Sequence, residues 1–217
     1  NTQSFIPQDT SNLIYRAMAE LFDYVGYEQK GYRITQDSQI PMTRGLGSSS
    51  ACIIGGMLAA NIISGRQLSY QEIIHLAATM EGPDNVGPAL FGGFCVSLMD
   101  DDKTIIKSTK LKSHIKFAVI IPDFFVATKK SRGVLPSKID FKDAVFNVGH
   151  ASMFQAAMLT CDMKALEIGV KDKLHQQYRK SYVDGMEDIF EKTYHLGSHA
   201  TYLSGSGPTI LSILDGN

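Results

Sequence analysis

Residues 41–51 constrain this chain more than any other part of its sequence. They place two glycines and three consecutive serines between an extended stretch, residues 32–40, and an apolar helical stretch, residues 51–63. Glycines let the backbone curl close to an anion, and the first N–H groups of a helix have no partners within the helix. A strand, a Gly/Ser loop and a helix N-terminus in that order therefore predict a phosphate site. An ordinary helix cap before a packing helix stays open as the alternative, because serine is also a favoured N-cap.

Two familiar phosphate loops are excluded for this segment. The sequence contains no Gly-Lys-[Ser/Thr], so it has no Walker A loop, and the segment does not match Gly-x-Gly-x-x-Gly. The residues of the predicted phosphate site are Pro41, Met42, Thr43, Arg44, Gly45, Leu46, Gly47, Ser48, Ser49, Ser50 and Ala51.

The composition indicates a globular protein without a nucleic-acid or membrane partner. Hydrophobic residues make up 44% and charged residues 20% of the chain, and the net charge is −1. No apolar run is long enough for a membrane span, and no signal peptide precedes Asn1. Three widely spaced cysteines are typical of free thiols in a reducing compartment, so we expect a cytoplasmic location.

The pattern of elements predicts an α+β fold. An apolar stripe with a 3.6-residue period predicts a helix that Gly26 ends, and Ser69 with Glu72 forms a capping box for another. Hairpins and packed helices are mixed without a regular βαβ series. The expected helices cover about residues 13–25, 51–63, 69–80, 141–160, 165–170, 174–182 and 184–196, and the expected strands about residues 32–40, 91–99, 104–108, 115–121, 202–203 and 209–214.

The predicted phosphate loop resembles the Pro-x-x-x-Gly-Leu-Gly-Ser-Ser-[Ser/Ala]-Ala loop of the GHMP kinases, named for galactokinase, homoserine kinase, mevalonate kinase and phosphomevalonate kinase. Its Arg-Gly-Leu-Gly-Ser-Ser-Ser-Ala spelling is most similar to the homoserine kinases. The resemblance implies ATP and Mg²⁺ as cofactors. It also implies two domains, an ATP-binding domain like ribosomal protein S5 domain 2 over residues 1–109 and a ferredoxin-like domain over residues 110–217. The family's first motif is absent, so we expect both domains to be incomplete and the chain to be a piece of a longer protein.

Glu81 is the candidate metal ligand. It follows Ala77 and Ala78 at four- and three-residue offsets, which predicts that it shares their inward helical face. An unpaired buried carboxylate is costly, and Mg²⁺ takes one or two carboxylates together with phosphate oxygens. If the helix ends one residue early, Glu81 is instead solvated. In the GHMP kinases a glutamate at the matching place serves Mg²⁺, and the resemblance implies Ser50 or Ser49 as its companion.

Residues 83–93 carry the candidate catalytic amide. By themselves Pro83, Asp84 and Asn85 are most simply a rigid polar turn that feeds a strand. They resemble the Pro-Asp-Asn segment of the homoserine kinases, which implies that Asp84 and Asn85 contact the substrate. Asn85 cannot take a proton, so a conventional general base is missing there. The family segment has a histidine between the residues that match Gly82 and Pro83. Either the protein has lost this residue, or the protein has it and the printed sequence joins the pieces on either side of it.

Two arginines and a threonine complete the candidate residues. Thr128 and Arg132 lie in a basic stretch that predicts a helical turn stopped by proline, and by themselves such charges are usually solvated. The stretch resembles the family's Thr-x-x-[Ala/Ser]-Arg-x-x-Leu-Pro motif, and the residues around Arg179 resemble Asp-x-Leu-His-x-x-Tyr-Arg. The resemblance implies that Thr128 lies near the transferred phosphoryl group and that both arginines bind the homoserine carboxylate. A planar guanidinium suits that role because it pairs bidentately with a carboxylate.

The motifs follow one another in family order over nearly the whole chain, ending with a glycine turn at residues 203–209. The resemblance implies ATP-dependent phosphorylation of the L-homoserine hydroxyl, a step in threonine biosynthesis, by a protein that forms a homodimer. Two alternatives stay open: a GHMP kinase for an alcohol that is not an amino acid, and a catalytically silent nucleotide-binding protein of the same fold.

Overall fold

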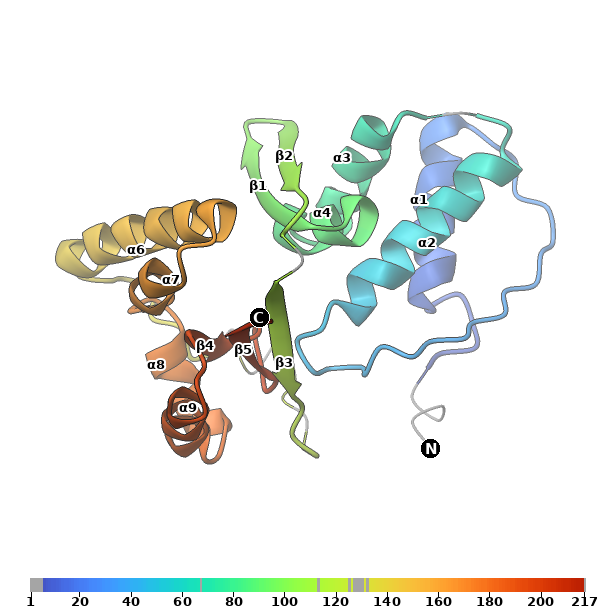
Figure 1. Ribbon diagram of the computed structural model, residues 1–217. Coiled ribbons are helices and arrows are strands. Elements are labelled where there is room, and N and C mark those ends of the chain that lie inside the picture. Colours follow the sequence, from blue (N-terminus) through green and yellow to red (C-terminus); the bar gives the residue numbers. More distant parts are fainter. Residues whose placement is uncertain are drawn as a thin grey trace. The chain divides into compact units, whose positions relative to one another are not determined.

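The computed structural model describes residues 6–66, 68–112, 114–124, 126, 131 and 133–216. The chain forms two compact units (Figure 1). The first unit comprises Asn1–Ile40 and Gly47–Lys110, and the second comprises Pro41–Leu46 and Leu111–Asn217. The predicted phosphate loop is therefore divided, since its first six residues group with the second unit. Among the described residues, no helix is both long and apolar enough to cross a membrane.

The first unit holds four helices and one hairpin among its described residues. In chain order they are α1 (Leu13–Val25), α2 (Ser48–Ile63), α3 (Tyr70–Met80), α4 (Pro83–Phe91), β1 (Phe94–Asp100) and β2 (Lys103–Thr109). The two strands pair antiparallel, with Phe94 opposite Thr109 and Asp100 opposite Lys103. The capping box at the start of α3 is confirmed, because the Ser69 and Glu72 side chains each bond the other residue's backbone N–H.

The core of the first unit lies between its helices. The largest fully buried side chains are apolar and come from four different helices, namely Leu21, Phe22, Ile53, Met57, Ile73, Ile74 and Val86. Helices α1 and α2 pack closely, and Gly56 makes this approach possible. A Cβ at Gly56 would lie 2.7 Å from the Ile14 carbonyl oxygen and 3.0 Å from the Ala17 Cβ.

Replacing Gly56 with alanine should therefore lower the free energy of unfolding, by about 1–3 kcal/mol, because the added methyl forces the two helices apart. Gly55 is the matched control on the same helix, since a Cβ there meets nothing within 4 Å. Gly55→Ala should instead be stabilising by about 0.5–1 kcal/mol, since glycine disfavours a helix interior. Urea unfolding of both variants measures the difference, and effects of the same sign would contradict the close approach.

The strand expected over residues 32–40 is absent. Residues 27–39 have no regular secondary structure and belong to neither sheet. Burial alternates over residues 31–36, and Tyr32 and Ile34 pack against the core of the first unit. The alternation that suggested a strand is thus real. The described residues offer no neighbouring strand to supply the ladder hydrogen bonds that define one.

The second unit combines a three-stranded antiparallel sheet with helices. Its described elements are β3 (Ile115–Ile120), α6 (Phe141–Thr160), α7 (Met163–Gly169), α8 (Gln176–Arg179), the 3₁₀ turn η2 (Lys180–Tyr182), α9 (Met186–His195), β4 (Ala200–Leu203) and β5 (Ile210–Asp215). The strand order is β3-β5-β4, so β5 is central. With the first unit's helices and hairpin, this confirms the α+β class.

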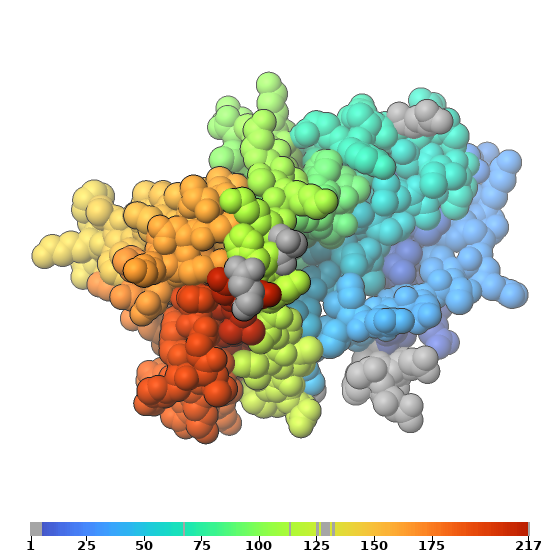
Figure 2. Space-filling model, viewed as in Figure 1, coloured from blue at the N-terminus to red at the C-terminus, as the bar shows by residue number. Residues whose placement is uncertain are grey.

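The helices of the second unit pack through small residues as well as apolar ones. Helices α6 and α7 lie side by side, yellow and orange in Figures 1 and 2. The two helices come closest at Gly169 of α7, because a Cβ at this position would lie 2.6 Å from the Phe154 backbone nitrogen of α6. Ile210 and Ile213 of the central strand are fully buried. This unit also holds α8, which carries the candidate residue Arg179, and the glycine turn between β4 and β5.

Candidate phosphate and amino-acid sites

The candidate phosphate loop has the curled backbone that its sequence predicts. Thr43, Gly45 and Gly47 all have positive φ, at 54°, 71° and 75°. Helix α2 begins at Ser48, three residues earlier than expected, so the serines form its first turn. The N-cap is Gly47, and no side chain caps the helix. Its first N–H groups and the positive end of its dipole are therefore available to an anion.

Glu81 lies against this helix start. Its Oε1 accepts a hydrogen bond from Ser49 Oγ at 2.7 Å, and its Oε2 accepts one from Ser50 Oγ at 2.9 Å. Ser50 is fully buried. The expected position inside α3 is wrong, because that helix ends at Met80 and Glu81 is an extended C-cap residue. The carboxylate is nevertheless not merely solvated, since two serines of the phosphate loop hold it.

The residues after Glu81 are helical, where the sequence alone suggested a turn. Helix α4 begins at Pro83, whose fixed φ and missing N–H suit the first position of a helix. Asp84 and Asn85 follow in the first turn. Asp84 is exposed and Asn85 is half-buried, and the Asn85 backbone N–H donates to the Gly82 carbonyl at 3.1 Å. The structure thus brings Ser49, Ser50 and Glu81 into contact and begins a helix with Asp84 and Asn85 directly after them.

In the second unit, the first half of the loop packs on the β4–β5 turn. Ser204 Oγ donates to the Gly45 carbonyl oxygen at 2.6 Å. A Cβ at Gly45 would run into the Ser204 carbonyl oxygen and lie 3.2 Å from that of Gly207. Only a glycine fits this contact, and its positive φ adds to the requirement. The two glycine-containing motifs, distant in sequence, therefore lie against each other.

The predicted residues Thr128 and Arg132 fall outside the described residues. Their neighbour Ser131 is described and buried, and its Oγ donates to the Ser206 carbonyl oxygen at 2.8 Å. This bond ties Ser131 to the same β4–β5 turn that contacts Gly45.

Arg179 is buried, with 9% of its surface exposed, and it contacts the same turn. Its Nη1 donates to the Gly205 carbonyl oxygen at 2.8 Å, and its Nε donates to the Ser131 carbonyl oxygen at 3.3 Å. Nη1 also lies 3.1 Å from His175 Nδ1. These contacts fix the guanidinium of Arg179, which is therefore not a solvated surface charge.

Asp172 organises the start of α8. Its carboxylate accepts from three backbone N–H groups, of Leu174, His175 and Gln176, at 2.7–3.1 Å, and from Asn147 Nδ2 at 2.8 Å. Burial opposes the charge, but these hydrogen bonds outweigh it and hold the pKa of Asp172 below its ordinary value. Asp172 and His175 belong to the motif quoted around Arg179, but the sequence alone assigns a role to neither of them. The motif and the four-residue spacing between His175 and Arg179 are the signals that could have found the histidine.

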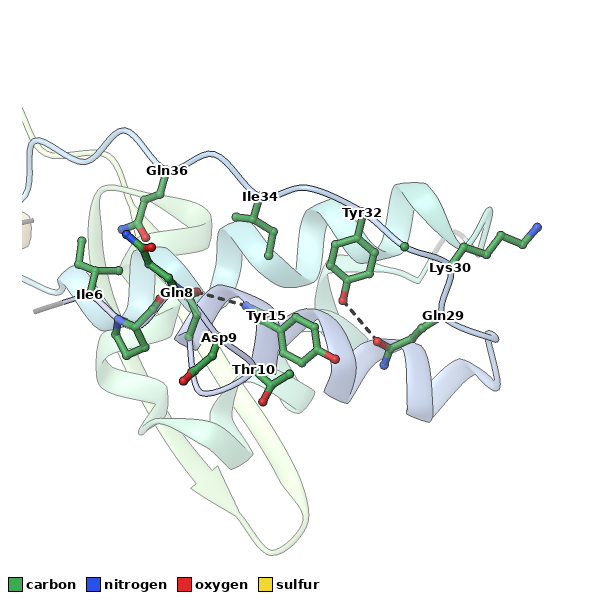
Figure 3. A pocket seen from close by; sticks show the side chains of 13 residues that line it. Ile6, Gln8, Asp9, Thr10, Tyr15, Gln29, Lys30, Tyr32, Ile34 and Gln36 are labelled. Carbon is green, nitrogen blue, oxygen red and sulfur yellow. Dashed lines mark hydrogen bonds between the residues drawn. The ribbon is translucent and has the colours of Figure 1, made fainter. Parts of the chain in front are cut away.

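The described residues hold no cluster of three or more His, Cys, Asp or Glu side chains that could bind a metal by themselves. A cation near Glu81 would therefore take its other ligands from hydroxyls, phosphate or water. A separate cavity of about 860 Å³ lies in the first unit (Figure 3). Tyr15 and Tyr32 line it with Gln29, which accepts from the Tyr32 hydroxyl at 3.4 Å. None of the predicted site residues lines this cavity.

Comparison with known proteins gives consistent matches. The model of the GHMP kinases N-terminal domain matches residues 12–93. A homoserine kinase of Caldicellulosiruptor bescii is 44% identical over 213 residues, which cover 98% of this chain and 69% of that protein. One of Clostridium beijerinckii is 45% identical over 206 residues, which cover 94% of this chain and 69% of that protein.

A solved structure supports the same grouping. The crystal structure of a homoserine kinase from Cytophaga hutchinsonii matches with a TM-score of 0.89 at 25% identity. The match covers 100% of this chain and 71% of the other. The sequence match and the structural match therefore both cover nearly the whole of this chain.

Proposed function

This chain belongs to the homoserine kinases of the GHMP kinase family, and we propose that its residues transfer the γ-phosphoryl group of ATP to the side-chain hydroxyl of L-homoserine. The observation that carries the assignment of residues is the contact of Glu81 with Ser49 and Ser50 at the uncapped start of α2. A cytoplasmic location and a homodimer belong to the same proposal.

The loop of residues 41–51 would hold the phosphates of ATP. The curled backbone supports this role, because it directs the N–H groups at the start of α2 toward an anion without competition from a capping side chain. Ser48 adds a hydroxyl at the first helical position. The packing of Gly45 against Ser204 fixes the first half of the loop, so the loop needs little ordering when it binds ATP.

Glu81, Ser49 and Ser50 fit a hard divalent cation such as Mg²⁺. All their ligand atoms are oxygens, the type that Mg²⁺ prefers, and they already lie within hydrogen-bond distance of one another. In this proposal Glu81 and Ser50 are the ligands and Ser49 orients the carboxylate. When bound, ATP and its cation supply the phosphoryl group and neutralise the charge that develops on the phosphate oxygens.

Arg179 and Arg132 would bind the amino acid by its carboxylate, and Asp84 would contact it as well. The fixed guanidinium of Arg179 supports this assignment, because a pre-positioned arginine loses little side-chain freedom on binding. Arginine also suits the task because its guanidinium stays charged and makes charge-assisted hydrogen bonds to carboxylate oxygens.

Asn85 and Thr128 would orient the homoserine hydroxyl for attack. The Asn85 amide donates and accepts hydrogen bonds but cannot take a proton. Catalysis in this proposal therefore comes from orientation and from stabilisation of charge. That is sufficient in principle, because phosphoryl transfer through a loose transition state asks little of a base.

A coupled ADP-release assay with homoserine, mevalonate and galactose side by side tests the function. We expect turnover with homoserine and at least tenfold lower kcat/KM for the other two. Galactose has no carboxylate for the arginines to pair with, and mevalonate has a carboxylate but lacks the amino group and the spacing between carboxylate and hydroxyl of homoserine. If kcat/KM were highest for mevalonate or galactose, that alcohol and not homoserine would be assigned as the substrate. ATP binding without turnover of any of the three would favour a silent protein, which the direct junction of Gly82 and Pro83 keeps as the second candidate.

A further inference from the structure

His175 is a titratable group beside the proposed carboxylate-binding arginine. Its Nδ1 lies 3.1 Å from Arg179 Nη1. A guanidinium has only donors, so Nδ1 must be the acceptor in this bond and cannot carry a proton. The ring is therefore neutral in this arrangement, and its proton is on Nε2.

The other side of the ring supports the same tautomer. Asp172 Oδ1 lies 3.9 Å from His175 Nε2, so the protonated nitrogen faces a carboxylate. That carboxylate is itself fixed by its bonds to Asn147 and to the start of α8. Asp172, His175 and Arg179 thus form a chain of contacts in which each side chain limits the orientation of the next.

The protonation of His175 responds to opposing influences. Burial lowers the pKa of His175 below its ordinary value of 6.5, the negative charge of Asp172 raises it, and the positive charge of Arg179 lowers it further, with a net decrease. Among the described residues, these are the two charges that face the ring. The imidazole therefore keeps its neutral form to lower pH than an ordinary histidine does.

We propose that neutral His175 is a positioning residue, which holds the guanidinium of Arg179 in the orientation that receives the amino-acid carboxylate. The inference rests on the proposed function, since it assumes that Arg179 binds that carboxylate. Protonation of His175 removes the acceptor and places a second positive charge beside the guanidinium. The affinity for the amino acid should accordingly fall as the pH falls through the pKa of His175, while ATP affinity stays constant.

The test compares two substitutions. His175→Leu removes the acceptor, and we expect KM for homoserine to rise about tenfold while kcat and KM for ATP change less than about twofold. His175→Asn keeps an oxygen where Nδ1 was and does not titrate. Its KM for homoserine should stay near that of the wild type, and the increase in KM on the acid side should disappear.

The matched control is His195→Asn, because His195 is exposed on α9, with 77% of its side-chain surface accessible. This variant should keep the wild-type increase in KM for homoserine at low pH. Calorimetric titration of homoserine without ATP, over a series of pH values that descends until the protein begins to unfold, gives the same comparison without turnover. If His175→Leu does not fold, the pH profile of His175→Asn alone decides.

Arg179→Ala separates failure of the inference from failure of the proposed function. If Arg179→Ala leaves KM for homoserine unchanged, the proposed role of Arg179 is wrong and the inference falls with it. Only the inference is overturned if Arg179→Ala raises KM for homoserine but His175→Leu does not. The same holds if His175→Asn keeps the increase in KM for homoserine at low pH. In the double variant, loss of His175 should add nothing to the loss of Arg179, because it acts through that arginine.

Discussion

Glu81→Gln should lower kcat at least about 10²-fold, because it removes the one carboxylate charge that the phosphate loop holds beside the start of α2. Glutamine is nearly isosteric and keeps an oxygen that can accept from Ser49 or Ser50. The loss would therefore report the charge and not the packing. Steady-state ADP release at several Mg²⁺ concentrations measures the effect, and the concentration needed for half-maximal rate should increase.

Glu20→Gln is the control for this prediction, since Glu20 is exposed on α1. It removes the same charge from the same unit and should leave kcat unchanged. A Glu81→Gln variant that turns over within about tenfold of the wild type would mean that the carboxylate is structural and that the cation, if one is needed, has other ligands.

Gly45→Ala should lower the free energy of unfolding by about 3 kcal/mol, which combines the penalty for a left-handed residue with a steric collision. The alanine methyl would meet the Ser204 carbonyl oxygen, and the Ser204 hydroxyl already donates to the Gly45 carbonyl. Relief of the collision must displace the phosphate loop or the β4–β5 turn. We therefore expect weaker ATP binding together with the lost stability, measured by calorimetric titration and urea unfolding.

Gly149→Ala provides the comparison for the stability measurement. Gly149 lies in the same unit, within α6, and a Cβ there meets nothing within 4 Å. Helix propensity predicts a gain of about 0.5–1 kcal/mol for this change. If the two alanine variants were equally stable, the close packing of Gly45 would have to be absent in solution.

Local signals predicted the elements that local interactions determine. The capping box of Ser69 and Glu72 marked the start of α3, and the sequence indicated α6 with the bounds that the structure gives it. The helical pattern of α1 and its ending at Gly26 were likewise correct. In each case the residues that define the element lie within a few positions of one another.

Features that depend on distant partners were not predictable in the same way. Residues 32–40 have the alternation of a strand, but a strand also needs a neighbour, which no local pattern reveals. The sequence alone predicts a turn at Pro83, although proline equally suits the first position of a helix, which is the position it has in α4. The position of Glu81 was wrong by one residue, yet its association with the serines was predicted, because the family resemblance supplied the long-range information.

The candidate sites show the same limit. Asp172, His175 and Arg179 are close in sequence, but the bonds of Arg179 to Ser131 and Gly205 join segments that are far apart. The sequence predicted Arg179 as a substrate ligand only through the resemblance, and this role stays a proposal. The contact with His175 became evident only from the side-chain arrangement around α8.

Because the phosphate loop is divided between the two units, no single cut in the sequence separates one unit from the other. Its first six residues belong with the second unit, whereas the helix that continues them belongs to the first. A single cut near residue 110 would leave the β4–β5 turn without Gly45, whose carbonyl accepts from Ser204. The isolated second half would thus lack part of its own interior. Recombining halves from related kinases at that point would pair each turn with a foreign loop, so the two segments are expected to be inherited together.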